Sequence, residues 1–376
     1  MNIYVVGGAV RDRLLGLPVK DFDYVVVGST PEEMIQKGFR PVGQDFPVFL
    51  HPITNNEYAL ARTERKTAPG YKGFIFHADA SVTLTQDLAR RDLTINAMAQ
   101  EIDERGELVG PVIDPYGGQE DLKNKIFRHV GPAFVEDPLR VLRVARFAAR
   151  FVDFSIAQET LELLKKISAS GELKALVKER VWQELVKGLD AEKPSKMFAV
   201  LMTCGADGEL FQKAFDSGYS EKFFKYVDAS AAQKMKLPQR YAALLHGLSH
   251  DLIEVLSNKL SATVECKDYA VLTHQLVDGL SRYKASPSAK ILVSILDRVD
   301  VWRKPERFLD LIEVVKLVPC ETASLQKAYE LARAVDVAEI AKSVQPGPGA
   351  GDMIKLAIQQ ARVNAIGVGE SPAQGV

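Results

Sequence analysis

Apolar residues in the first third of the chain occur in short runs, with glycine and proline between the runs. Five of these runs are typical of β-strands, at residues 2–6, 22–28, 47–52, 57–62 and 108–114. Residues 9–16 and 31–37 instead repeat their apolar positions at the spacing of a helix. Up to about residue 128, the pattern therefore predicts a small domain of mixed strands and helices.

From about residue 130 onwards, apolar positions follow the period of helices almost throughout. Clear examples are PLRVLRVARFAARF at 138–151, SAKILVSILDRVDVW at 288–302 and FLDLIEVVKLV at 308–318. Proline and glycine in QPGPGAG, residues 345–351, interrupt the pattern, and one last helix is expected at 352–366 before a frayed polar tail. The pattern as a whole predicts an α+β fold, in which a mixed domain precedes an all-α region.

Composition narrows this picture only a little. The 48 lysines and arginines nearly cancel the 49 aspartates and glutamates, so net charge neither favours nor excludes a nucleic-acid partner. The three cysteines are far apart and odd in number, which is typical of a reducing compartment and offers no disulfide framework or zinc spacing. No apolar run approaches the ~18 residues of a membrane span, and a strand that begins at residue 2 leaves no room for a signal peptide. We therefore expect a cytoplasmic protein with no membrane partner.

Two carboxylates, Asp21 and Asp23, flank a single residue at the start of the strand predicted at 22–28. Side chains two apart in a strand share a face, so the two acids would lie side by side while Phe22 points to the core. A divalent cation would neutralise such a pair, and magnesium typically binds one or two carboxylates together with substrate phosphates. The pair therefore indicates phosphoryl-group chemistry. The alternative is an ordinary turn in which both acids are solvated.

A glycine pair lies upstream of these acids, between the first predicted strand and the first predicted helix. Gly7 and Gly8 would let backbone N–H groups approach an anion where the helix begins at Ala9. Arg11, in the first turn of that helix, can reach the same phosphates. A glycine turn alone often only connects two elements. Together with the arginine and the acid pair, it forms a constellation suited to phosphate and metal.

The segment that contains these residues, GGAVRDRLLGLPVKDFD, is the first of six motifs in a fixed order over about residues 1–210. The others are QDFPVFL, EYALARTERK, RRDLTINAMA, DPYGGQEDL and EDPLRVLRVARFAARF. The set resembles that of the CCA-adding tRNA nucleotidyltransferases, of the bacterial and eukaryotic-type class within the nucleotidyltransferase superfamily. The resemblance implies template-independent addition of CCA to the 3′ acceptor end of tRNA from CTP and ATP, with release of pyrophosphate.

The four domains of this family imply a division of the chain. A catalytic head at 1–135, with a small mixed β-sheet and helices, would precede a helical neck at 136–210 that recognises the base. A helical body at 211–340 and a tail at 341–376, with a tRNA-binding helix and a frayed end, would follow. The sequence leaves open whether the protein is a monomer or a homodimer.

The resemblance also assigns roles to individual residues. Asp21 and Asp23 correspond to the catalytic ligands of Mg²⁺. The residues implied in ATP and CTP binding are Gly8, Arg11, Arg91, Asp137, Arg140 and Arg143. Further candidates are Gly7, Glu57, Asp92, Asn96 and Arg146. Among these, Glu57 is either a third carboxylate of the site or a solvated acid at a strand edge, while Asp92 and Asn96 either contact the sugar or only order a turn.

The segment EDPLR supplies a means of selecting the base. Cytosine and adenine share an exocyclic amino donor beside a bare ring nitrogen, whereas uracil and guanine present a carbonyl beside an N–H. Asp137 can accept a hydrogen bond from the amino group, and Arg140 can donate one to the ring nitrogen. The resemblance implies that this pair acts as a protein template. Asp137 is also a good N-cap with Pro138 at the first helical position, and both interpretations can hold.

Four arginines follow the same segment, at positions 140, 143, 146 and 150. At ~100° per residue they fall within an arc of about 120° on one helix face. Such a face is commonly just solvated, but four arginines with no acid between them favour a nearby anion. In KERVWQELVKGL, residues 178–189, the charged residues Glu179, Arg180 and Glu184 are expected to form structural ion pairs that orient this helix.

Residues 61–89 contain glycine, proline and basic residues between ordered segments, which predicts a mobile loop. The resemblance implies that this loop helps the switch from C to A addition, and its length favours the complete activity over a CC-only enzyme. Two alternatives stay open. The first is a poly(A) polymerase of the same superfamily, and the second, from another class, is a catalytically silent RNA-binding protein.

Many relatives of this kind carry a metal-dependent phosphohydrolase domain marked by a His-Asp pair. Here His246 is followed by glycine, and the dipeptide His250–Asp251 has a single later histidine, His274, behind it. Such a hydrolase needs several His and Asp ligands. We therefore expect no phosphohydrolase activity.

Overall fold

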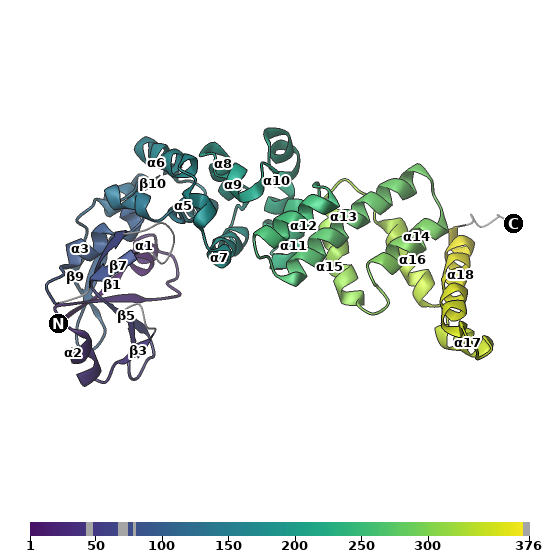
Figure 1. Ribbon diagram of the computed structural model, residues 1–376, viewed down its shortest axis with the longest axis horizontal. Helices are drawn as coiled ribbons and strands as arrows, with labels where there is room; N and C mark the ends of the chain where they lie inside the picture. The colour runs from purple at the N-terminus through teal and green to yellow at the C-terminus, as the bar shows by residue number, and fades with distance from the viewer. Residues whose placement is uncertain (43–47, 67–73, 78–79, 371–376) are drawn as a thin grey trace. The chain divides into compact units, whose positions relative to one another are not determined.

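Seven strands form one mixed sheet in the N-terminal part of the chain, in the order β3-β4-β5-β2-β1-β8-β9 (Figure 1). Their bounds are β1 Asn2–Val6, β2 Asp23–Val27, β3 Arg40–Val42, β4 Val48–Leu50, β5 Glu57–Leu60, β8 Ala99–Ile102 and β9 Leu108–Ile113. Neighbouring strands are antiparallel except β2 and β5, which run parallel. All five predicted strands are present, and β3 and β8 are additional.

The computed structural model describes residues 1–42, 48–66, 74–77 and 80–370. Two antiparallel strands, β6 (Thr63–Lys66) and β7 (Phe74–His77), occupy much of the segment predicted as a mobile loop. The part between them, 67–73, lies outside the described residues, as do residues 44–47 of the QDFPVFL motif.

Apolar side chains cover both faces of the sheet, because successive residues of a strand point to opposite sides. Val25 joins a buried cluster with Val6 and Leu88, whereas Val26 joins a second cluster with Met34. The helical turns of this region are α1 (Gly8–Leu14), α2 (Pro31–Gln36), α3 (Leu84–Ala89), η2 (Thr94–Asn96) and α4 (Gly118–Lys123). Capping boxes begin both α2 and α3, which explains why such short helices form.

Helices follow, as the periodicity predicts. They are η3 (Pro132–Glu136), α5 (Arg140–Arg150), α6 (Gln158–Ala169), η4 (Glu172–Ala175), α7 (Lys178–Leu189), α8 (Ser195–Thr203) and α9 (Asp207–Phe211). Two short strands, β10 (Ile126–Phe127) and β11 (Ser155–Ile156), pair in parallel among them. On α5 the apolar residues are fully buried, including Val141, Leu142 and Val144, so the apolar stripe of the sequence is the inner face of the helix.

The remaining helices form the C-terminal part of the chain. They are α10 (Ser217–Ala232), α11 (Leu237–Leu245), α12 (His250–Lys259), α13 (Val264–Ala285), α14 (Ala289–Arg298), α15 (Pro305–Lys316), α16 (Ala323–Arg333), α17 (Val337–Ser343) and α18 (Ala350–Glu370). The break between α17 and α18 coincides with QPGPGAG, as predicted, and the expected frayed end at 371–376 lies outside the described residues. Within the described part of the chain, no helix is long and apolar enough to cross a bilayer.

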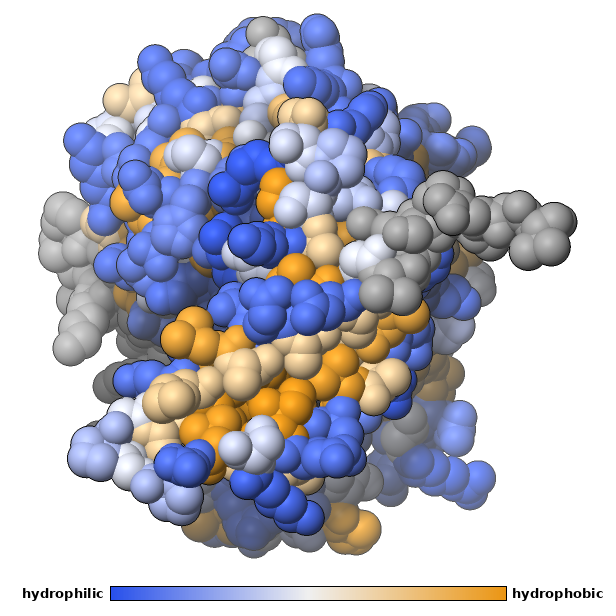
Figure 2. Space-filling view, turned by 90° about the vertical axis from the view of Figure 1, so that its right-hand side faces the viewer, coloured by the Kyte–Doolittle hydropathy of each residue, from blue (hydrophilic) through white to orange (hydrophobic). Residues whose placement is uncertain are grey.

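The chain divides into two compact units. One comprises Met1–Gly188 with Lys196–Lys213, and the other comprises Leu189–Ser195 with Ala214–Val376. The α+β fold class is confirmed, while the finer division into head, neck, body and tail stays a prediction. Figure 2 shows a band of apolar side chains on the face of the molecule that it presents. Met353 and Leu356 of α18 are exposed.

Candidate active site

A cavity of about 560 Å³ in the first unit brings together most of the residues that the sequence singles out. Its volume is typical of a site for a small molecule. The lining residues are Gly7, Gly8, Arg11, Asp23, Arg62, Arg90, Arg91, Asp92, Asn96, Asp137, Arg140, Arg143, Arg146, Phe147, Arg150 and Arg180. All predicted site residues are among them except Asp21 and Glu57.

The glycine turn forms one wall of this cavity. Gly7 has a φ of +69°, a conformation that favours glycine, and its amide donates a hydrogen bond to the Met98 carbonyl at 3.0 Å. A Cβ at this position would lie 2.8 Å from Nη1 of Arg91, so the end of that side chain would have to move aside. Helix α1 begins at Gly8, one residue before the predicted start.

Arg11 is almost fully buried at the back of the turn, with 3 % of its surface exposed. Its Nε donates to Oδ1 of Asp12 at 2.8 Å, and its Nη1 donates to Oδ1 of Asn96. The guanidinium also lies over the rings of Phe147 and Phe151, at 5.3 and 5.0 Å from their centroids. Burial lowers the pKa of Arg11 although Asp12 opposes the shift, and the group stays cationic.

Two further arginines are held by one buried acid. Asp87 has no exposed surface, and its carboxylate accepts from Nε of Arg90 at 3.0 Å and from Nη2 of Arg91 at 3.3 Å. The backbone amide of Arg62 donates to the same carboxylate at 3.3 Å. Asp87 therefore fixes three neighbouring arginine positions along this wall.

The RRDLTINA motif forms a turn that is ordered by its own side chains. Oδ1 of Asp92 accepts from the Leu93 amide at 2.8 Å and from Nδ2 of Asn96 at 2.9 Å. Its Oδ2 accepts from Nε of Arg143 at 2.8 Å. Burial would raise the pKa of Asp92, but the charge of Arg143 and these hydrogen bonds outweigh it and hold the pKa well below its usual range. Asp92 and Asn96 thus order the turn, while a contact with the sugar stays a prediction.

The EDPLR segment departs from the prediction in where its helix begins. Helix α5 begins at Arg140 rather than at Pro138, although Oδ1 of Asp137 still accepts from the Leu139 amide at 3.0 Å, as a capping residue does. Arg140 donates to the carbonyls of Ala133 and Arg90, so backbone contacts fix its guanidinium. The second oxygen of Asp137 pairs with Arg180 at 3.3 Å.

The other arginines of α5 pair with acids from distant segments of the chain, since α5 itself contains no acidic residue. Glu184 of α7 is buried and contacts both Arg143, at 3.7 Å, and Arg146, at 2.6 Å. Arg150 pairs with Asp12 of α1 at 2.8 Å. The predicted ion pairs of Arg180 and Glu184 are therefore present, whereas Glu179 forms none among the described residues.

The acid pair lies where β2 begins. Asp23 is the first residue of β2, opposite Val6 of β1, whereas Asp21 precedes the strand. Phe22 is 42 % exposed, so its predicted burial is wrong. Its ring stacks with that of Tyr24, the two centroids being 6.3 Å apart, but it lies beyond the edge of the core because the strand has not yet begun.

Glu57 occupies the matching position on the neighbouring strand. Tyr24 of β2 is in register with Tyr58 of β5, so Asp23 and Glu57, each one residue earlier, lie on the same side of these parallel strands. In the described ranges, no group of three His, Cys, Asp or Glu side chains is close enough to hold a metal ion. The carboxylates of Asp23 and Glu57 are both exposed, and Asp23 lines the cavity. Such carboxylates still suit magnesium, which completes its coordination shell with water and phosphate oxygens.

Comparison with known proteins identifies the family. The family described as "Poly A polymerase head domain" matches residues 3–128, and the one described as "Probable RNA and SrmB-binding site of polymerase A" matches residues 153–217. A multifunctional CCA protein of Burkholderia lata is 46 % identical over 97 % of this chain and 98 % of that protein. The chain belongs to the CCA-adding enzymes of the nucleotidyltransferase superfamily.

Solved structures of CCA-adding enzymes share the fold. One apo form matches with a TM-score of 0.71 at 24 % identity, over 98 % of this chain and 91 % of that one. The Thermotoga maritima CCA-adding enzyme complexed with tRNA matches with a TM-score of 0.67 at 23 % identity, over 98 % and 92 % of the two chains. The resemblance drawn from the motifs is thereby confirmed at the level of family and fold.

Four arginines and one phenylalanine of this CCA-adding enzyme line the cavity without having been predicted as site residues. They are Arg62, Arg90, Phe147, Arg150 and Arg180. Arg62 and Arg90 belong to motifs of the family, and Arg150 completes the arginine arc of α5, so a signal exists for these three. Arg180 was predicted only as a structural ion-pair residue, because its place beside Asp137 depends on how α7 packs.

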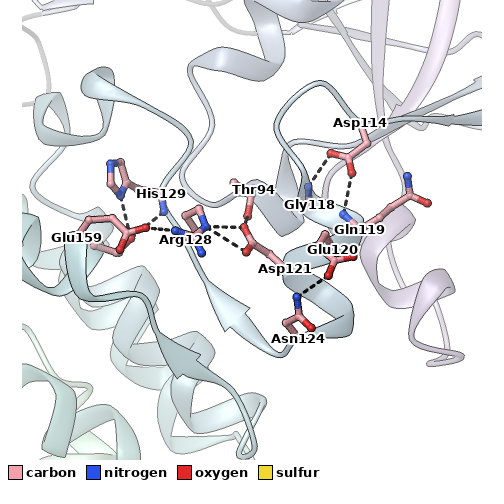
Figure 3. A network of polar contacts seen from close by, with 11 residues as sticks. Thr94, Asp114, Gly118, Gln119, Glu120, Asp121, Asn124, Arg128, His129 and Glu159 are labelled. Carbon is pink, nitrogen blue, oxygen red and sulfur yellow. Dashed lines mark hydrogen bonds and ion pairs between the residues drawn. The ribbon is translucent and has the colours of Figure 1, made fainter.

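A second polar network in the same unit lies away from the cavity (Figure 3). Asp121 of α4 accepts from Oγ1 of Thr94 at 2.7 Å and pairs with Arg128, which in turn contacts Glu159 of α6. Asp114 caps α4 through the amides that follow it. None of these residues lines the cavity. The DPYGGQEDL motif of this CCA-adding enzyme therefore connects elements of the fold.

Proposed function

We propose that this CCA-adding enzyme builds and repairs the 3′-terminal CCA of tRNA from CTP and ATP, and that the arginine cavity holds the incoming nucleotide. The 3′-hydroxyl of the tRNA attacks the α-phosphorus, a new phosphodiester bond forms, and pyrophosphate leaves. The observation that carries the proposal is the density of arginine around a cavity that Asp23 also lines. Homologous proteins of this family are named for the same activity.

The charge of the cavity favours a triphosphate. Nine arginines line it, against three lining aspartates, and the acids that pair with these arginines from behind are Asp12, Asp87 and Glu184. Among the residues that the structure describes, these six carboxylates are three fewer than the nine lining arginines. Fixed cations in a recessed site attract an anionic ligand and stabilise charge that develops on transferring phosphoryl groups.

Asp21 and Asp23 are the residues that would hold magnesium. When bound, the metal supplies charge neutralisation for the phosphates and activation of the attacking hydroxyl. The residues of the chain do the rest: Arg11, Arg91 and Arg143 bind and orient the phosphates, and the glycine turn brings the backbone close. Glu57 stays a candidate for a supporting carboxylate.

Base selection is proposed to occur at Asp137 and Arg140. The carboxylate of Asp137 is held by the Leu139 amide and by Arg180, which keeps it in one orientation, able to accept from an amino group. The guanidinium of Arg140 is held by two carbonyls, which fixes the orientation from which it would donate to the ring nitrogen of the base. Such a rigid pair matches the edges of cytosine and adenine.

Several finer points belong to the same proposal. The tRNA partner would contact the second unit, with α18 as one contact, and the protein would act in the cytoplasm as a monomer or a homodimer.

No phosphohydrolase activity is proposed, because His246 is buried against the Ala243 carbonyl and the exposed His250 contacts only Asp251 among the described residues. Release of phosphate from a 2′,3′-cyclic or monoester substrate with added metal would contradict this.

The proposal is tested with purified protein, magnesium and tRNAs that end before CCA, after C and after CC. Each labelled nucleotide is offered in turn. Stepwise addition of C, C and A that then stops supports the proposed function. A long A tail would identify a poly(A) polymerase, an end at CC would identify a CC-only enzyme, and tRNA binding without incorporation would identify a silent RNA-binding protein.

A further inference from the structure

Asp12 lies in α1, outside the lining of the cavity, and its carboxylate is shared by two lining arginines. Oδ1 accepts from Nε of Arg11 at 2.8 Å and pairs with Nη2 of the same side chain at 2.7 Å. Oδ2 accepts from Nη2 of Arg150 at 2.8 Å, across 138 residues of sequence. One buried acid therefore connects the glycine-turn helix to the end of the helix that begins with the base-reading residues.

Arg11 and Arg150 differ in how firmly groups other than Asp12 hold their side chains. Arg11 is also held by Asn96 and by the rings of Phe147 and Phe151. The side chain of Arg150 is 41 % exposed, and besides Asp12 it contacts the face of the Phe151 ring at 4.9 Å. An exposed arginine has many rotamers, so an ion pair that selects one of them removes an entropic cost from ligand binding.

We infer that Asp12 is a positioning residue for the triphosphate: it holds Arg150, and with it Arg11, in the orientation that receives the phosphates. The inference rests on the proposed function. Asp87 and Glu184, the other two acids that pair with lining arginines from outside the lining, pair with other residues than Arg150. Asp87 pairs with Arg90 and Arg91, and Glu184 pairs with Arg143 and Arg146.

The test compares Asp12→Asn, Arg150→Gln and the double variant in steady-state CTP incorporation. Asp12→Asn should raise KM for CTP about tenfold, the effect of one charge-assisted hydrogen bond, with a smaller change in kcat. Arg11 keeps its contacts with Asn96 and two aromatic rings without Asp12, so the same substitution should raise KM by less than threefold in the Arg150→Gln background. Asp12→Glu, which keeps the charge, should restore most of the affinity.

Asp121→Asn is the matched control. Asp121 is as buried as Asp12 and also pairs with an arginine, but that arginine, Arg128, does not line the cavity. The control should leave KM within twofold of the parent protein. An unchanged KM in Asp12→Asn, an equal rise in Asp121→Asn, or full additivity in the double variant would each overturn the inference.

Two outcomes keep this inference apart from the proposed function. If the parent protein adds no nucleotide to tRNA, the proposed function fails before any variant is compared. If the parent protein adds C, C and A while Asp12→Asn binds CTP normally, only the positioning role fails. Should Asp12→Asn not fold, Asp12→Glu and Arg150→Gln carry the test, with a KM for Arg150→Gln equal to that of the parent as the contradicting result.

Discussion

The first unit contains two networks built from the same chemical pairs, and only one of them leaves positive charge unbalanced. In the network of Figure 3, Arg128 meets two carboxylates, those of Asp121 and Glu159. Around the cavity, the nine lining arginines outnumber the three lining aspartates together with Asp12, Asp87 and Glu184, the acids outside the lining that pair with them. Paired arginines connect elements of a fold, whereas arginines in excess of their acids attract an anion. The balance of charge, and not the presence of ion pairs, marks the site.

The largest effect is expected where the cavity meets the acid pair. Asp23→Ala removes the carboxylate that would bind magnesium, and nucleotide transfer should fall by about 10³-fold or more. The surplus positive charge remains, so binding of CTP without metal and affinity for tRNA should stay close to those of the parent protein. Single-turnover incorporation and filter binding measure the two. Residual transfer within tenfold of the parent rate would refute the metal role of Asp23.

A smaller effect concerns choice of nucleotide rather than rate. Asp137→Ala removes the acceptor for the amino group of cytosine or adenine, and discrimination against UTP and GTP should fall by about 10- to 100-fold. The comparison of kcat/KM for the four nucleotides, on tRNA that ends before CCA, measures it. Asp153→Asn, which alters an exposed pair with Lys125, is the control. Selectivity equal to that of the parent would exclude a base-reading role.

A substitution in the network of Figure 3 should lower the stability of the fold and leave KM for CTP unchanged. Asp121→Asn weakens the contacts with Thr94 and Arg128, and the free energy of unfolding should fall by about 2 kcal/mol. For CTP, KM should not move, because none of these residues lines the cavity. Thermal unfolding and steady-state kinetics on the same preparation separate the two effects. A raised KM with unchanged stability would reverse the distinction between the networks.

The smallest effect is a dependence of stability on pH in the same region. Burial, followed by the charge of Arg128, lowers the pKa of His129 below its ordinary value near 6.5. The unfolded state therefore binds more protons below pH 6.5, so stability is lost as pH falls through that value toward the pKa of the folded state. Screening by solvent keeps this change small, because His129 is only partly buried. In His129→Gln, the difference in melting temperature between pH 7.5 and 5.5 should be smaller than in the parent protein.

The elements of the site could be predicted because their signals are local. The Gly7 turn, the Asp21 and Asp23 pair and the arginine arc of α5 are each set by spacing within a few residues. The burial of Phe22 was wrong because strand β2 starts one residue later than its apolar pattern suggests. The roles predicted for these site residues stay predictions.

The spacing of residues along the sequence could not predict which acids pair with these arginines. Arg180 reaches Asp137 across 43 residues, and Arg150 reaches Asp12 across 138. These contacts depend on the packing of α1, α5 and α7, which no local pattern encodes. The sequence therefore predicts a cationic helix face, but not which of its charges remain in excess.

A crystal structure of the protein with CTP and magnesium tests the central claim most directly. The triphosphate should lie against Arg11 and Arg143 beside Asp23, and the amino group of cytosine should face Asp137. Density for CTP elsewhere in the chain, with the arginine cavity filled only by water, would contradict the claim that its excess charge exists to bind the nucleotide.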